Sequence, residues 1–192
     1  MSAKKGWTQA RMREVAKEER DELGLDPFDP LDPYELAEAH GIPTYTLTDL
    51  LDHGLDPETR DHFHAAGARD WSAALVPLGT ARVIVENESH LEVRRRSNIA
   101  HEMGHHLLEH PFDSVILGED HKEQFDPALE KQAAFISGEL LVPDEGARKA
   151  AYAGWDNAKV ARTFNVSEQF AQMRMYGARV IAARAAKKYS RT

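Results

Sequence analysis

The segment IAHEMGHHLLEHP, residues 99–111, holds four histidines at spacings that suit a metal site. Two zinc-binding patterns overlap in it: His101 and His105 form an HExxH pattern, and His106 and His110 form the inverted HxxEH pattern. Each pair is four residues apart, and residues at this spacing lie on the same face of an α-helix. Either pair could therefore direct two imidazole nitrogens at one ion.

The flanking residues favour the HExxH pair. This pair would lie in the interior of a helix whose N-cap we expect at Ser97 or Asn98. The HxxEH pair would lie in the last turn, because His110 directly precedes Pro111 and the residue before a proline disfavours α-helical geometry. We therefore interpret His110 as a helix-end residue. Gly104 destabilises a helix relative to alanine, so we expect it to let another element pack close beside the metal.

Glu102 is the predicted general base. It lies about 100° around the helix from His101, so it is badly placed as a ligand but can reach a water beside the metal. Zinc lowers the pKa of such a water toward ~7, and a glutamate can then take its proton. The pattern thus indicates a metal hydrolase. The alternative is a chance match, because HExxH fixes only three positions.

A catalytic zinc needs a third protein ligand and an open position. The chain has no cysteine, and the next predicted helix, ALEKQAAFISGELL, offers Glu130. Ala133 and Ala134 share a face with Glu130 and would let this helix pack closely against the histidine helix. The competing interpretation of Glu130 is a solvated residue stabilised by the helix dipole. Glu139 points elsewhere, and we expect it to be solvated.

The length of the chain suggests one domain, or one domain with a small appendage. The 192 residues carry a net charge of −8, but residues 157–192 contribute +7, which leaves −15 for the rest. An acidic body disfavours nonspecific nucleic-acid binding by the whole protein. No stretch approaches the ~20 apolar residues of a membrane span. The N-terminal lysines precede no apolar run, so we expect a cytoplasmic protein.

The order of predicted elements, helices followed by a small sheet and more helices, indicates an α+β fold. We expect Asp32 to cap a short helix that starts at Pro33. Residues 49–70 have no clear pattern, and an acidic loop covers 112–126. The other predicted helices cover 7–23, 128–141, 145–154, 157–164 and 168–188, and the predicted strands cover 42–47, 72–78 and 81–87. The last strand could offer an edge to an extended substrate, or it could lie against the core.

Two segments, RRRSNIAHEMGHHLLEH and LEKQAAFISGELLVP, resemble the ImmA/IrrE family of zinc metallo-endopeptidases, in the gluzincin-like group that combines HExxH with a glutamate. The resemblance implies a mainly helical, zincin-like metallopeptidase domain with a small three-stranded sheet over residues 1–143. A helix-turn-helix-like helical part over 144–192 would follow it.

Residue by residue, the resemblance implies one Zn²⁺ bound by His101, His105 and Glu130, with Glu102 as the base. The sequence departs from the broader group at Ala134, where an acid that orients a histidine ligand is often found. The group that stabilises the oxyanion is also unassigned. The candidates for it are His106, Tyr152 and Tyr176.

Family members are implied to cleave a helix-turn-helix transcriptional repressor and so to trigger a stress or mobile-element response. The C-terminal segment AKVARTFNVSEQFAQMRM has helix-turn-helix spacing, with Asn165 at the turn. It could recognise the repressor, contact DNA or simply pack on the peptidase domain, and DNA contact is the least favoured. The rival function is a DNA-binding or regulatory module whose zinc site is structural or inactive. Glu102 distinguishes the two functions, because a structural zinc site does not need an acid beside an open coordination position.

Overall fold

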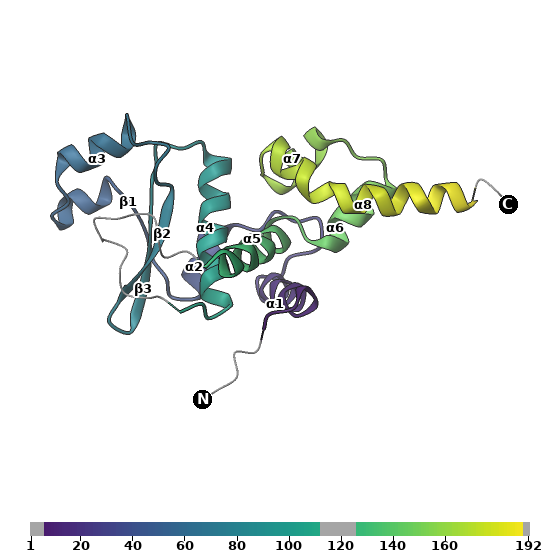
Figure 1. The fold of residues 1–192 in the computed structure, drawn as a ribbon, viewed down its shortest axis with the longest axis horizontal. Helices are drawn as coiled ribbons and strands as arrows, with labels where there is room; N and C mark the ends of the chain where they lie inside the picture. Colours follow the sequence, from purple (N-terminus) through teal and green to yellow (C-terminus); the bar gives the residue numbers. More distant parts are fainter. Residues whose placement is uncertain (1–5, 112–125, 190–192) are drawn as a thin grey trace.

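The computed structural model describes residues 6–111 and 126–189, and helices dominate this part of the chain (Figure 1). Three strands form one small sheet, so the predicted α+β class is confirmed. The helices are α1 (Gln9–Glu22), α2 (Pro33–Ala39), the 3-10 helix η1 (Asp49–His53), α3 (Pro57–His64), α4 (Glu92–Leu107), α5 (Pro127–Leu141), α6 (Asp144–Tyr152), α7 (Asn157–Phe164) and α8 (Glu168–Tyr189). The strands are β1 (Thr44–Thr46), β2 (Ala73–Leu78) and β3 (Ala81–Glu86).

The sheet has the strand order β1-β3-β2, with β1 parallel and β2 antiparallel to β3. The two predicted strands at 72–78 and 81–87 pair as a hairpin, and the second of them is the middle strand of the sheet. The expectation that β3 offers an edge to a substrate is therefore wrong, and among the residues that the structure describes the free edge of the hairpin belongs to β2. The backbone bond from Ile84 N–H to the Pro43 carbonyl (2.9 Å) shows why, because it ties β3 to the chain that leads into β1.

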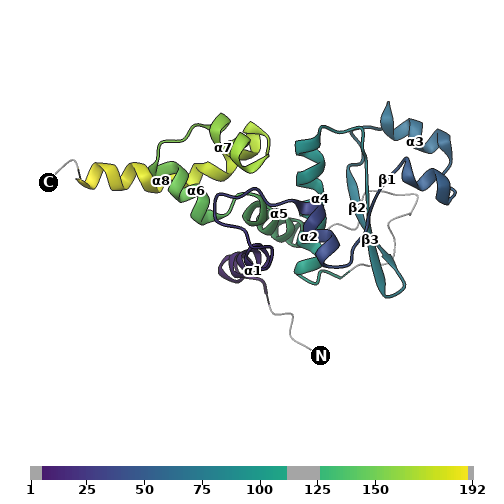
Figure 2. The same ribbon diagram turned by 180° about the vertical axis from the view of Figure 1, so that it is seen from behind.

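Helix α4 lies between the sheet and α5, and the two views agree on this arrangement (Figures 1 and 2). One side of α4 contacts β2 and β3, and α5 packs against another. Ile99 and Met103 of α4 and Ile136 of α5 are fully buried between these elements. Helix α2 also packs against α4, and α1 covers α5. The helix with the HExxH pattern is thus the central support of the fold.

Helix α4 starts earlier than predicted. Its N-cap is Leu91, so the expected cap at Ser97 or Asn98 is wrong. The Ser97 hydroxyl instead donates to the Val93 carbonyl (3.0 Å) inside the helix, which is a common alternative for a serine.

The arginines that precede Ser97 belong to α4 because the fold gives them buried partners. Arg95 makes a two-pronged ion pair with the buried Glu86 at 2.5 and 3.0 Å. Arg96 donates to the carbonyl oxygens of Leu31 (2.6 Å) and Asn165 (3.1 Å). These partners are distant in the sequence. The arginine-rich segment before Ser97 therefore resembles a loop when only the sequence is considered.

The predicted helix start at Asp32 and Pro33 is confirmed, and α5 has a cap of the same kind at Asp126, which the prediction placed in the acidic loop. The Asp32 carboxylate accepts from Tyr34 N–H (3.0 Å) with Pro33 in the first turn. Asp126 accepts from Ala128 N–H (2.8 Å) with Pro127 in the first turn of α5. The rest of the predicted acidic loop lies outside the described residues.

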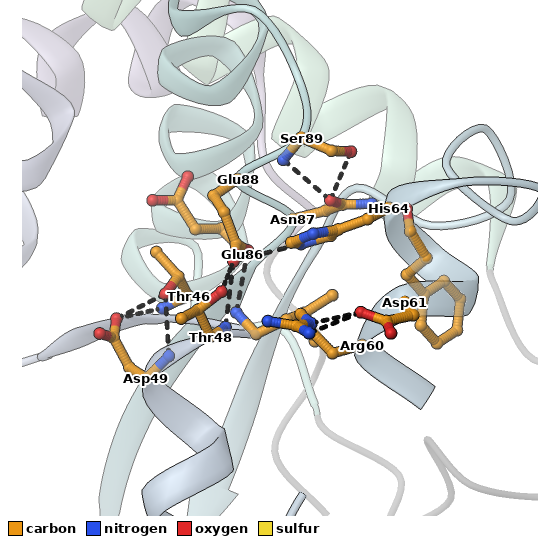
Figure 3. Close-up of polar contacts among 12 residues, drawn as sticks. Thr46, Thr48, Asp49, Arg60, Asp61, His64, Glu86, Asn87, Glu88 and Ser89 are labelled. Atoms are coloured by element: carbon orange, nitrogen blue, oxygen red, sulfur yellow. Dashed lines mark hydrogen bonds and ion pairs between the residues drawn. The ribbon is translucent and has the colours of Figure 1, made fainter. Parts of the chain in front are cut away.

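The segment without a clear pattern, residues 49–70, contains η1 and α3. Figure 3 shows how polar side chains attach it to the sheet. Glu88 accepts from the backbone N–H groups of Leu47 (3.1 Å) and Thr48 (3.0 Å), and it also lies 3.2 Å from His64 of α3. Polar pairing of this kind leaves no periodic apolar pattern, which explains why the sequence alone did not reveal these helices.

The prediction for Glu139 is wrong, because this side chain is buried. Its carboxylate lies 2.9 Å from the Arg174 guanidinium of α8 and 3.3 Å from that of Arg13 of α1, and it accepts from Asp144 N–H at 3.0 Å. Arg174 also donates to the Val142 carbonyl at 2.8 Å. Glu139 therefore joins the start of α6 to two helices, and a buried charge of this kind is tolerated because it is paired.

Helices α7 and α8 are joined by a short turn in which Asn165 has a φ of +49°, as expected for this position. Val160, Phe164 and Val166 are buried in the same hydrophobic cluster as the residues between α4 and α5. The helix-turn-helix-like interpretation and the division at residue 143 stay predictions. Among the described helices, none has the length and apolar character to span a membrane.

The packing of α5 on α4 predicts that Gly104→Ala destabilises the fold. A Cβ at Gly104 would lie 2.9 Å from both the Ala133 carbonyl oxygen and a methyl group of Ile136, and the backbone atom cannot move aside locally. We expect a loss of about 1–3 kcal/mol in the free energy of unfolding, measured by urea denaturation. The matched control is Gly177→Ala in α8, where nothing lies within 4 Å of the new Cβ. Equal effects of the two substitutions would contradict the packing argument.

Candidate metal centre

Three side chains that the sequence predicts as ligands meet between α4 and α5. Nε2 of His101 lies 3.1 Å from one carboxylate oxygen of Glu130, and Nε2 of His105 lies 3.2 Å from the other. The two Nε2 atoms are themselves 3.2 Å apart. His101, His105 and Glu130 are therefore a group that could hold a metal ion.

The spacing of the two histidine nitrogens fits a tetrahedral ion. Bonds of 2.0–2.1 Å to nitrogen and oxygen place neighbouring ligand atoms about 3.3 Å apart in a tetrahedron. The two Nε2 atoms are 3.2 Å apart, which is close to this value, and each of them lies 3.1–3.2 Å from a different oxygen of the Glu130 carboxylate. Two imidazole nitrogens and one carboxylate also match the ligand types that zinc prefers, and all three side chains are only half-buried, which leaves access for a substrate.

The two helices place these ligands by simple rules. His101 and His105 are one turn apart on α4, and Glu130 lies in the first turn of α5. Gly104 and Ala133 provide the close approach of the helices, as the sequence indicated. Ala134 is exposed, so the expectation that it contributes to this contact is wrong.

Glu102 lies beside the group, on the side of α4 that faces the sheet. One of its carboxylate oxygens accepts a hydrogen bond from Leu75 N–H of β2 at 3.0 Å. The pKa of Glu102 is raised to about 8, chiefly by burial; the hydrogen bond from Leu75 opposes the rise, and the negative Glu130 adds a smaller part to it. A carboxyl group with a pKa near neutrality is suited to take and return a proton.

The surroundings of His105 favour its neutral form. Burial, together with the nearby rings of His101 and His110, lowers the pKa of His105 to about 4. A neutral ring has a lone pair for a metal, whereas a protonated ring has none.

His110 has a position that the sequence did not reveal. Helix α4 ends at Leu107, so His110 lies beyond the helix and cannot pair with His106 on one helical face. Its Nδ1 lies 3.0 Å from Nδ1 of His105, and its Nε2 lies 3.0 Å from Oε1 of Gln132. The structure thus brings His110 to the HExxH site. No sequence signal marked it, because the chain reverses at Glu109 with a φ of +51°, which glutamate rarely adopts.

The three candidates for oxyanion stabilisation have different positions. His106 is half-buried, and its Nδ1 lies 2.6 Å from the Arg82 guanidinium of β3. Burial, Arg82 and the nearby His40 lower the pKa of His106 to about 4.

Tyr152 and Tyr176 are 60% and 76% exposed, on α6 and α8. Helix α6 begins beyond the C-terminal end of α5, whereas Glu130 lies in the first turn of α5. The eleven residues from Glu130 to Leu141 correspond to a distance of about 17 Å along the helix. The structure therefore places Tyr152 away from the metal group, and Tyr176 follows Arg174, which contacts the Val142 carbonyl at this same far end of α5.

Comparison with known families supports the same interpretation of the site. The peptidase family model described as the IrrE N-terminal-like domain matches residues 37–176, which is more than half of the chain. The protein therefore belongs to this peptidase family, and the resemblance to the ImmA/IrrE family is confirmed. The membership supports a metallopeptidase-type function. Searches of curated proteins and of solved structures return no significant match.

The geometry predicts that Glu130→Ala weakens metal binding. The substitution removes the only carboxylate of the group, so we expect the affinity for added Zn²⁺ to fall tenfold or more, measured by competition with a chelator. The control is Glu145→Ala, which also removes a glutamate from the first turn of a helix. An unchanged zinc affinity of the Glu130→Ala protein would show that Glu130 is not a ligand.

Proposed function

We propose that this protein is a zinc-dependent endopeptidase that hydrolyses a peptide bond in a protein substrate. One observation carries the proposal: the ligand atoms of His101, His105 and Glu130 converge as a group that could hold a metal ion, with the Glu102 carboxylate beside them at the edge of the sheet. Membership of a peptidase family supports it independently.

Each residue of the site would have a distinct task. His101, His105 and Glu130 would hold one Zn²⁺ and leave a fourth position open. When bound, zinc would supply a Lewis acid that polarises the peptide carbonyl and lowers the pKa of water. Glu102 would accept a proton from the attacking water and pass it to the leaving nitrogen. Its hydrogen bond to Leu75 N–H would keep the carboxylate in place.

The free edge of β2 is the proposed site for an extended substrate. Leu75 lies opposite Ile84, and Ile84 N–H bonds toward Pro43 rather than toward β2. The backbone groups of Leu75 therefore face away from β3, and its N–H meets Glu102. A strand added at this edge would lie next to the predicted base.

For oxyanion stabilisation we keep His106 as the proposed residue. It follows Glu102 by four residues, so both lie on the same face of α4. With Nδ1 engaged by Arg82, the neutral ring has its hydrogen on Nε2 and could donate it.

We propose a helix-turn-helix transcriptional repressor as the substrate and a cytoplasmic role in a stress or mobile-element response. The support is the sequence resemblance, and α7 and α8 are the proposed recognition part. The rival role in DNA binding is the less favoured proposal. Arg174 and Arg179 of α8 donate hydrogen bonds to the backbone carbonyls of Val142 and Trp155. These two basic side chains are therefore engaged within the fold.

The proposal predicts that Glu102→Gln separates metal binding from catalysis. The amide cannot take a proton, so cleavage of a cognate repressor should be abolished, while the zinc affinity stays within a few-fold of wild type. Cleavage is followed by electrophoresis and mass spectrometry of the fragments. The control is Glu92→Gln, the same change in the first turn of α4, which should cleave normally. If the Glu102→Gln protein cuts as fast as wild type, the catalytic assignment is wrong.

A further inference from the structure

The chain that follows α4 brings a third histidine against the proposed metal ligands. Nδ1 of His110 lies 3.0 Å from Nδ1 of His105, and its Nε2 lies 3.0 Å from Oε1 of Gln132 on α5. His110 is only 3% exposed, so water does not compete for these contacts. Its Nδ1 is directed at a ligand ring, so His110 is not itself a member of the ligand group.

The backbone of the helix end fixes this arrangement. His110 N–H donates to the His105 carbonyl, and Glu109 N–H donates to the His106 carbonyl, both at 3.0 Å. This pair of bonds is the Schellman motif that ends many helices, and it needs a residue with positive φ, which here is Glu109 at +51°. The motif links His110 to His105 by a backbone hydrogen bond, and the two imidazole rings are also in contact.

A second contact supports the same turn. The Trp7 indole N–H donates to the Leu108 carbonyl at 2.9 Å, so a carbonyl at the end of α4 has a partner. Positive φ costs a glutamate energy, and such a conformation persists where the surroundings determine it. The turn that carries His110 is therefore held from several sides.

The directions of the hydrogen bonds follow from metal binding at His105. A nitrogen that binds a metal offers a lone pair, so Nε2 of His105 carries no hydrogen and Nδ1 is the donor. Nδ1 of His110 must then accept, which places the hydrogen of this ring on Nε2. That N–H donates to the amide oxygen of Gln132. One tautomer of each ring satisfies every contact.

We propose that His110 is a positioning residue of the metal centre. It accepts a hydrogen bond from His105 and so holds the Nε2 lone pair of His105 toward the ion, and Gln132 fixes the tautomer of His110. The inference rests on the proposed metal binding by His101, His105 and Glu130. It also supplies the orienting group that the exposed Ala134 cannot provide.

The first test measures zinc affinity by chelator competition, without any assay of cleavage. His110→Leu keeps a buried apolar side chain but removes the acceptor, and we expect the affinity to fall roughly ten- to hundred-fold. His110→Asn keeps an oxygen near the position of Nδ1 and should recover part of the loss. Wild-type affinity in the folded His110→Leu protein would overturn the proposal.

A stability control separates positioning from loosening of the fold. Val160→Ala removes buried methyl groups from α7, which packs against α8. We expect it to lower the stability while zinc affinity stays near wild type. If Val160→Ala lowers both the stability and the zinc affinity as much as His110→Leu does, the effect of His110 is structural and the proposal is wrong.

The second test observes the hydrogen bond directly. In zinc-loaded, ¹⁵N-labelled wild-type protein, NMR should detect a scalar coupling between Nδ1 of His105 and Nδ1 of His110 across the N–H···N bond. The coupling should be absent in His110→Leu, and its absence in wild type would contradict the proposal. A wild-type protein that binds no zinc would overturn this inference and the proposed function together. Normal zinc binding and cleavage with an unaffected His110→Leu variant would overturn this inference alone.

Discussion

The close approach of α5 to α4 at Gly104 is the contact on which the rest of the structure depends. Ala133 lies where a side chain at Gly104 would have to be, so the two backbones come nearer than larger residues allow. This approach puts Glu130 within 3.2 Å of both ligand histidines. The same turn of α5 carries Gln132 to His110. One steric constraint therefore assembles the metal group and the contacts that surround it.

Helix α4 divides the chemistry between two of its sides. The side that faces α5 carries His101 and His105, which bring lone pairs to a metal. The side that faces the sheet carries Glu102 and His106, which contact Leu75 of β2 and Arg82 of β3. The sheet is small, but its position matters because it places a free strand edge next to the predicted base. The fold thus fixes metal ligands, base and proposed substrate edge relative to one rigid helix.

The sequence was sufficient where the determining contacts are local. The spacing of His101 and His105 predicts a shared helical face, and Glu130 follows from the absence of cysteine and from the face of the next helix. It was insufficient where the partner is distant. The start of α4 depends on Arg95 meeting the buried Glu86, and the burial of Glu139 depends on α1 and α8. The position of His110 depends on a backbone reversal that no sequence pattern marks.

The most direct test of the proposed metal centre is the X-ray absorption spectrum of the zinc-loaded protein. The three proposed ligands predict one zinc per chain, bound only by nitrogen and oxygen at about 2.0–2.1 Å, with scattering from two imidazole rings. A spectrum that requires three or more imidazoles would contradict it, because His106 or His110 would then be a ligand. A six-coordinate, mostly hydrated ion would contradict it equally, because the three converging side chains would not be holding the metal.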